Sequence, residues 1–135
     1  MANVIKLRKG LDINLKGIAA KELVSVKEPG IYSLVPDDFT GVKPKVVVKE
    51  GENVLAGGPL FVDKNHPEVK FVSPVSGVVT SVERGERRKV LNIIVKADEN
   101  QQYVEFGKMN LAELNAEQVK EALMNAGLFA FFRQR

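Results

Sequence analysis

The residues of this chain best suited to covalent chemistry are a lysine and the Ser-Pro-x-x-Gly element that follows it. Lys64 lies in the polar segment DKNHPE (63–68), and the element reads SPVSG over residues 73–77. A lysine amine at the tip of a β-hairpin can carry a covalently attached group to several active sites in turn. The first question is therefore whether the chain presents Lys64 in this way.

The spacing argues against that use of Lys64. Ser-Pro-x-x-Gly-Val-Val segments occur in small domains that carry lipoate or biotin on a lysine, and lipoyl domains have an Asp-Lys pair before the element. Here Lys64 lies ten residues before Pro74, and His66 stands where the carrier lysine would be. Pro67 also fixes the loop backbone, and the Met-Lys-Met of biotinyl domains is absent. We expect a solvated loop lysine, with modification of Lys64 as the alternative.

The second candidate is the charged turn GERR (85–88), the densest charge cluster of the chain. Guanidinium groups pair well with carboxylates and phosphates. A contact with a partner protein or another domain would therefore use Arg84, Glu86, Arg87 and Arg88. The other interpretation, which the frequency of such turns favours, is an ordinary solvated turn in which Glu83 and Glu86 neutralise two of the arginines locally.

Other chemistries lack the residues that they need. The chain has no cysteine and a single histidine, which excludes disulfides, thiolate metal sites and iron–sulfur ligation within it. No Gly-x-Gly-x-x-Gly leads from a strand into a helix, so no dinucleotide site is expected. A net charge of +3 without basic runs interleaved with aromatics is too weak for nucleic-acid binding. We expect no catalytic, cofactor-binding or metal-binding residue here.

The composition is that of a soluble protein. With 135 residues, 44% hydrophobic and 27% charged, the chain can form one compact domain, or one domain plus an appendage. No apolar stretch approaches the roughly 20 residues of a membrane-spanning helix. Membrane contact is therefore expected only through a partner.

Short β-strands must position the candidate residues. β-Branched runs between glycine, proline or charged turns predict strands at residues 3–9, 31–35, 43–51, 59–62, 68–72, 77–82 and 89–96, with 103–106 as a further candidate. Such strands favour small antiparallel sheets packed on each other. The run VLNIIV (90–95) has only Asn92 polar, which predicts burial on both faces.

The segment after residue 110 predicts one helix. Asn115 is a candidate N-cap, and Gln118 follows three residues later, as in a capping box. An apolar stripe at helical spacing consists of Val119, Ala122, Leu123 and Ala126. Gly127 suits the position just after the helix, from which Leu128 can fold back on Leu123.

The chain ends on LFAFFRQR, in which Phe129, Phe131 and Phe132 form an apolar patch. A free tail rarely exposes such a patch. The patch therefore either docks on this domain or begins a further domain, and we favour the second.

Several segments together resemble one known family. In chain order they are IKLRKGLDINLKG, DFTGVKPKVVVKEGENV, GGPLFVDKNHPEVKFVSPVSG, the GERR turn and GLFAFFRQR. They are similar to the NqrA subunits of the Na⁺-translocating NADH:quinone reductases (the NqrA family). The match runs nearly from end to end, and it is most specific over residues 38–88, where the order of segments matches as well as their types. The Ser-Pro-x-x-Gly element alone is shared with carrier domains and with the related RnfC electron-transport subunit.

The resemblance, with the strand pattern, implies a fold that is mainly β with α. We expect a lipoyl/biotinyl-like barrel-sandwich hybrid of short antiparallel strands, with flanking N-terminal strands and a C-terminal helix. Residues 1–37 would hold N-terminal strands and a connection, and residues 38–98 the barrel-sandwich domain. Residues 99–135 would hold a strand and a helix that lead into a C-terminal α/β domain missing here.

The resemblance also implies a function. Members of the NqrA family are peripheral proteins on the cytoplasmic side of the bacterial inner membrane, within a six-subunit complex. The complex oxidises NADH, reduces ubiquinone and exports Na⁺. Its flavins and iron–sulfur centres belong to partner subunits, and quinone binding is associated with the full-length NqrA protein. The chain would thus be an N-terminal structural and docking part of the enzyme, with no cofactor of its own. The alternatives are a carrier domain modified on Lys64 and the RnfC protein.

Overall fold

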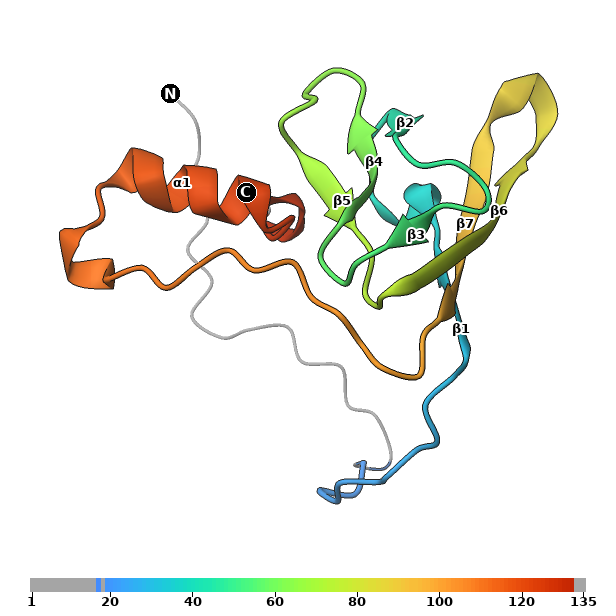
Figure 1. Cartoon of the computed structure of the whole chain (residues 1–135), viewed down its shortest axis with the longest axis horizontal. Coiled ribbons are helices and arrows are strands. Elements are labelled where there is room, and N and C mark those ends of the chain that lie inside the picture. Colours follow the sequence, from blue (N-terminus) through green and yellow to red (C-terminus); the bar gives the residue numbers. More distant parts are fainter. Residues whose placement is uncertain (1–16, 18, 133–135) are drawn as a thin grey trace, which may run out of the picture.

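Two antiparallel β-sheets form the body of the protein in a computed structural model that describes residues 17 and 19–132 (Figure 1). The larger sheet has the order β1-β7-β6-β3, with β1 at Ile31–Leu34, β7 at Val90–Ala97, β6 at Gly77–Arg84 and β3 at Asn53–Val54. The smaller sheet has the order β2-β4-β5, with β2 at Pro44–Val46, β4 at Pro59–Asp63 and β5 at Lys70–Val72. The mainly β fold of short antiparallel strands is therefore confirmed. The strand predicted at residues 3–9 lies outside the described residues.

The core lies between the two sheets. Its fully buried apolar residues are Leu60, Phe61, Val79, Ile93 and Val95, which come from both sheets. The rings of Phe61 and Phe71 stack at its centre, with their centroids 4.4 Å apart. Burial of each such side chain stabilises the fold by about 1.5–3 kcal/mol.

Strand β7 is buried on one face only, so the expectation of burial on both faces was wrong. Ile93 and Val95 are buried, whereas Ile94 between them and Asn92 beside them are half-exposed. Leu91, at a register shift in the pairing of β6 with β7, is 41% exposed. Asn92 joins the outer face, where it hydrogen-bonds to Ser33 of β1. An antiparallel sheet covered by one layer buries alternate residues. A continuous apolar run in the sequence therefore does not tell whether a strand is covered on one face or on both.

The candidate strand at residues 103–106 is reduced to a single bridge. Tyr103 pairs with Ala56 in parallel. The Ala56 N–H donates to the Gln102 carbonyl, and the Val104 N–H donates to the Ala56 carbonyl, both at 2.9 Å. The bridge ties the segment that leads to the helix to the edge of the body (Figure 1).

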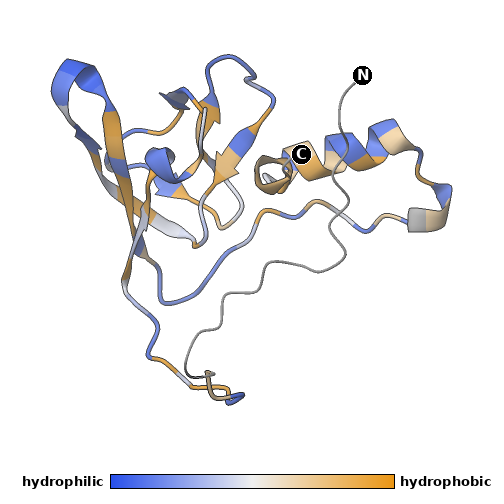
Figure 2. Cartoon of the chain, turned by 180° about the vertical axis from the view of Figure 1, so that it is seen from behind, coloured by the Kyte–Doolittle hydropathy of each residue, from blue (hydrophilic) through white to orange (hydrophobic). Residues whose placement is uncertain are grey.

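The predicted helix is confirmed as α1, Ala116–Asn125. Asn115 and Gln118 form both hydrogen bonds of the capping box. Gly127 has a φ of +70°, and the Leu128 N–H donates to the Leu123 carbonyl at 2.9 Å, which is the Schellman arrangement. None of the helix residues is buried. Helix α1 stands to one side of the sheets, as both overall views show (Figures 1 and 2).

Candidate functional site

Lys64 lies at the base of the β4–β5 hairpin loop. The buried Asp63 ends β4, and its Oδ1 accepts hydrogen bonds from the N–H groups of Lys43 (3.2 Å) and Asn65 (3.1 Å). The Lys64 N–H donates to the Lys43 carbonyl at 2.7 Å. The two bonds with Lys43 hold the backbone at Asp63 and Lys64 against the segment that enters β2. The side chain of Lys64 is exposed.

The tip of this hairpin is made by the residues after Lys64. The Val69 N–H donates to the His66 carbonyl at 2.9 Å and closes a four-residue turn. Pro67 takes the second position of this turn, which its fixed φ suits. His66 Nδ1 lies 3.7 Å from Glu68 Oε1, on the exposed surface. The prediction that Lys64 is not at the tip is confirmed.

The Ser-Pro-x-x-Gly element is clamped by a segment that follows β7. Ser76 is buried. Its N–H donates to Gln101 Oε1 at 2.7 Å, and its Oγ accepts from the Gln102 N–H at 2.9 Å. Gln101 Nε2 also donates to the Asp98 carbonyl at 2.8 Å. The element thus joins the start of β6 to the chain beyond β7.

The glycine of the element is required by close packing of two strands. A Cβ at Gly77 would overlap the backbone carbonyl of Lys96 on β7. Ser73 is also satisfied locally, because its Oγ donates to the Val75 carbonyl at 2.6 Å. The serines and the glycine of SPVSG therefore have structural roles in this fold, independent of any attached group.

The β6–β7 turn has a backbone that residues with side chains rarely adopt. The Lys89 N–H donates to the Glu86 carbonyl at 3.1 Å, and the two residues between them have left-handed φ values, 53° at Arg87 and 62° at Arg88. These are features of a type I′ turn, in which Asn-Gly is favoured. The left-handed conformation costs a non-glycine residue about 1–2 kcal/mol. The sequence located this charge cluster but carried no signal for its strained conformation.

The arginines of this turn have no acidic partner in the described part of the chain. Arg84, Arg87 and Arg88 are exposed, and the ion pairs found among residues 19–132 are His66–Glu68 and Lys89–Asp37. Arg84 Nη1 makes one long contact, 3.5 Å, with the Arg88 carbonyl. The turn therefore presents three guanidinium groups without a carboxylate.

The acidic residues near this turn either bond to other residues or form no ion pair with a described residue. Glu83 Oε2 accepts a hydrogen bond from Asn92 Nδ2 on β7 at 2.9 Å, and Asp37 pairs with Lys89. Glu86 is exposed and forms no ion pair with any described residue. No ion pair within 4.0 Å joins Glu83 or Glu86 to an arginine in the described residues, and the choice between a contact surface and a solvated turn stays a prediction.

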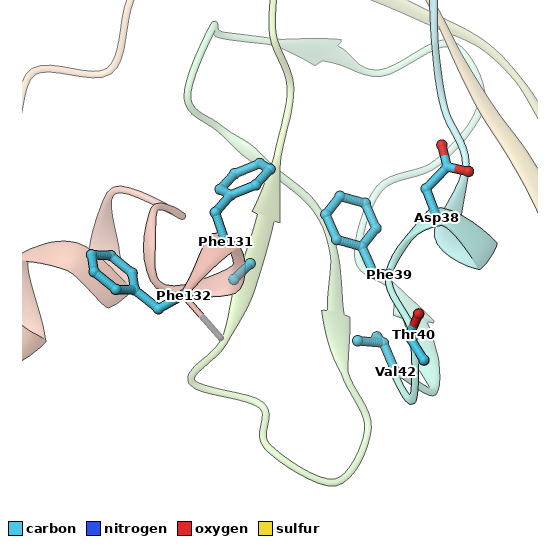
Figure 3. A pocket seen from close by; sticks show the side chains of 7 residues that line it. Asp38, Phe39, Thr40, Val42, Phe131 and Phe132 are labelled. Atoms are coloured by element: carbon cyan, nitrogen blue, oxygen red, sulfur yellow. The ribbon is translucent and has the colours of Figure 1, made fainter. Parts of the chain in front are cut away.

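The C-terminal aromatic residues border a groove (Figure 3). The 3-10 turn η4, Phe129–Phe131, lies next to β5. The Phe131 ring is 5.9 Å from the Phe39 ring, and Phe39 lies 4.6 Å from Phe71 of the core. Phe131 remains 68% exposed and Phe132 65% exposed. The patch thus docks on the body by one edge and leaves the other edge open.

The groove has a volume of about 740 Å³ and is lined by Asp38, Phe39, Thr40, Val42, Ala130, Phe131 and Phe132. Phe129 has Lys120 Nζ 5.9 Å from the centre of its ring and does not line the groove. The two predicted contact regions are not brought together, since the β6–β7 turn lies far from η4 in both overall views (Figures 1 and 2).

Metal ligation and membrane insertion find no support in the described ranges, 17 and 19–132. No group of three His, Asp or Glu side chains there could hold a metal ion. The helices of that part are too short or too polar to cross a bilayer.

The chain is similar in sequence to known proteins over nearly its whole length. The family model of the NqrA N-terminal barrel-sandwich hybrid domain matches residues 5–98. The chain is 37% identical over 134 residues to the NqrA subunit of the Na(+)-translocating NADH-quinone reductase from Hahella chejuensis, and 34% identical over 134 residues to that from Actinobacillus pleuropneumoniae serotype 5b. The corresponding protein from Pseudomonas aeruginosa strain UCBPP-PA14 is 33% identical over 135 residues. Each match covers 98% of this chain and 30% of the relative.

Proposed function

Because the chain belongs to the family of NqrA N-terminal barrel-sandwich hybrid domains, we propose that it is a structural and docking part of the NqrA subunit of a Na⁺-translocating NADH-quinone reductase. The names of its relatives support this assignment. The complex would couple NADH oxidation and ubiquinone reduction to sodium export. Since the chain spans about 30% of the length of these relatives, the activity belongs to the larger assembly.

The observation that carries the docking role is the β4–β5 hairpin. A carrier domain must present its lysine at the tip, and here the tip is the turn His66-Pro67-Glu68-Val69. The Ser-Pro-x-x-Gly element that would mark a carrier is accounted for by its clamp to Gln101 and Gln102. The fold therefore supports a rigid body better than a modified arm.

In this proposal, partner subunits hold the redox groups. Flavins, iron–sulfur centres and the NADH site would lie outside this chain, which has no cysteine and no dinucleotide motif. The protein would sit on the cytoplasmic side of the membrane through its partners. Its contacts would use Arg84, Glu86, Arg87 and Arg88 in the turn and Phe129, Phe131 and Phe132 in the aromatic patch.

Mass spectrometry tests the choice between docking part and carrier. The protein is expressed with lipoate and biotin ligases and their substrates, and we expect the intact mass of the unmodified chain. A lipoyl domain expressed in the same cells shows that the ligases are active. An added lipoyl or biotinyl mass that disappears in Lys64→Arg would reject the proposal. A separate test is co-purification with the other reductase subunits, whose failure would reject membership of the complex.

A further inference from the structure

We propose that the β6–β7 turn binds an acidic protein surface, with Arg84, Arg87 and Arg88 as the residues that engage its carboxylates. This inference rests on the proposed docking function and specifies the chemistry of one partner surface. It is carried by the unpaired charges of the turn, its backbone conformation and its position on the molecule.

The arginines of the turn have unused hydrogen-bonding capacity. A guanidinium group has five N–H donors arranged to pair with a carboxylate in two parallel bonds. In the described structure, none of the three guanidinium groups has a carboxylate oxygen within 4.0 Å. The nearby Glu83 and Asp37 are engaged by Asn92 and Lys89 instead. The fold thus engages two of the neighbouring acids elsewhere, and Glu86 forms no ion pair in the described structure, so the arginines stay available.

The backbone under two of these arginines is strained. Arg87 and Arg88 occupy the left-handed positions where Asn-Gly would be comfortable. Both residues are exposed, so no burial in the core compensates for the strain. Strain kept at an exposed site points to a use in binding rather than in folding.

The turn is also accessible to a partner. The β6–β7 hairpin extends beyond the rest of the sheet, and its turn lies at the end of the molecule away from α1 (Figure 1). A partner can therefore reach the turn without displacing the helix or the aromatic patch.

The charge pattern favours a protein surface over an anionic membrane. Membrane-binding clusters typically bring about 4–8 Lys or Arg residues together. In this turn three arginines are free of ion pairs with described residues, whereas Lys89 pairs with Asp37. Glu83 and Glu86 each precede an arginine, which weakens attraction to a uniformly negative surface. A surface with separate carboxylates can pair with the arginines, while Glu83 stays bonded to Asn92 and Glu86 lies at the edge of the contact.

Two double variants in the native complex test the inference. The complex is purified through a tag on a partner subunit, and the amount of this protein retained is measured. We expect Arg87→Glu/Arg88→Glu to weaken retention about tenfold or more. Added salt should also weaken retention of the wild-type protein, because it screens the charges. Arg87→Asn/Arg88→Gly should also weaken retention, while it raises the thermal unfolding midpoint of the full chain because the strain is relieved. Lys45→Glu/Lys108→Glu, at two other exposed lysines, controls for the change in net charge.

Each of the other outcomes counts against the inference. Equal retention of the wild type and Arg87→Glu/Arg88→Glu overturns this inference alone. Failure of the wild type to co-purify rejects the proposed function, and the inference with it. A lower unfolding midpoint in Arg87→Asn/Arg88→Gly would show that the arginines serve the fold. Sedimentation with phosphatidylglycerol vesicles that is lost in Arg87→Glu/Arg88→Glu would replace the protein partner by a membrane.

Discussion

At the scale of single residues, the Ser-Pro-x-x-Gly element is explained by packing and hydrogen bonding. Gly77 leaves room for the Lys96 carbonyl of the neighbouring strand. Ser76 is buried, and both its N–H and its Oγ are satisfied by the chain at residues 101–102. A pattern shared with carrier domains can therefore persist for structural reasons when the lysine is displaced from the hairpin tip.

Replacement of Gln101 tests this clamp. Gln101→Ala leaves the N–H of buried Ser76 without its acceptor, so we expect a loss of about 1–2 kcal/mol in the free energy of unfolding. Gln102→Ala is the matched control, because Gln102 contributes its backbone N–H and its side chain is exposed. That control should stay within about 0.5 kcal/mol of the wild type. Urea denaturation followed by circular dichroism measures both, and equal effects would contradict the clamp.

At the scale of elements, helix α1 is specified locally but held weakly by the body. Its capping box and Schellman motif use residues within the helix and its ends. None of its residues is buried, and its apolar stripe lines a shallow groove with Phe106 and Met109. Just after the helix the chain packs closely on β5, since a Cβ on Gly127 would lie 2.5 Å from Val72. The capping of the helix therefore matters for its stability.

Loss of the N-cap should loosen the helix without affecting the sheets. Asn115→Ala removes the bond from the Gln118 N–H to Asn115 Oδ1, 2.8 Å long, and should cost about 1 kcal/mol. Amide exchange in α1 should then become about fivefold faster, while exchange in β6 and β7 stays unchanged. Glu121→Ala, at an exposed helix position, is the control. Unchanged exchange in Asn115→Ala would show that tertiary packing holds the helix.

At the scale of the whole molecule, a column of aromatic rings joins the core to the C-terminal turn. Phe61 stacks on Phe71, Phe39 meets Phe71 edge to face at 4.6 Å, and Phe131 meets Phe39 at 5.9 Å. Figure 3 shows Phe131 and Phe39 side by side at the groove. The outer part of this column is exposed to solvent, and the arginine turn is exposed at another place on the surface. In the described part of the chain, the open end of the column and the arginine turn are thus an apolar and a cationic surface that lie apart from each other.

Removal of the Phe39 ring, which lies in the middle of the column, should lower the stability of the fold. Phe39→Ala deletes a half-buried ring that contacts Phe61, Phe71 and Phe131, and we expect a loss of about 3 kcal/mol in the free energy of unfolding. Phe132→Ala serves as the control, because that ring is 65% exposed, and it should change stability by less than about 0.5 kcal/mol. Chemical denaturation measures both variants. A Phe39→Ala variant as stable as the control would show that the column contributes nothing.

Features that depend on neighbouring residues could be predicted from the amino-acid sequence. Asn115, Gln118 and Gly127 specified the ends of α1, and the spacing of Lys64 from Pro74 excluded that lysine from the hairpin tip. Helix caps, and turns with proline or glycine at the favoured positions, form within a few residues, so their signals are local.

Two features are decided only by the packing of the sheets. One is which face of β7 is covered, and the other is that no described carboxylate pairs with the arginines of the β6–β7 turn. Leu91 is exposed at a register shift in the pairing of β6 with β7, and Asp37 pairs with Lys89, which lies 52 residues away in the chain. Contacts between segments that are distant in the sequence depend on how the two sheets pack, and the composition of each segment alone does not determine that packing.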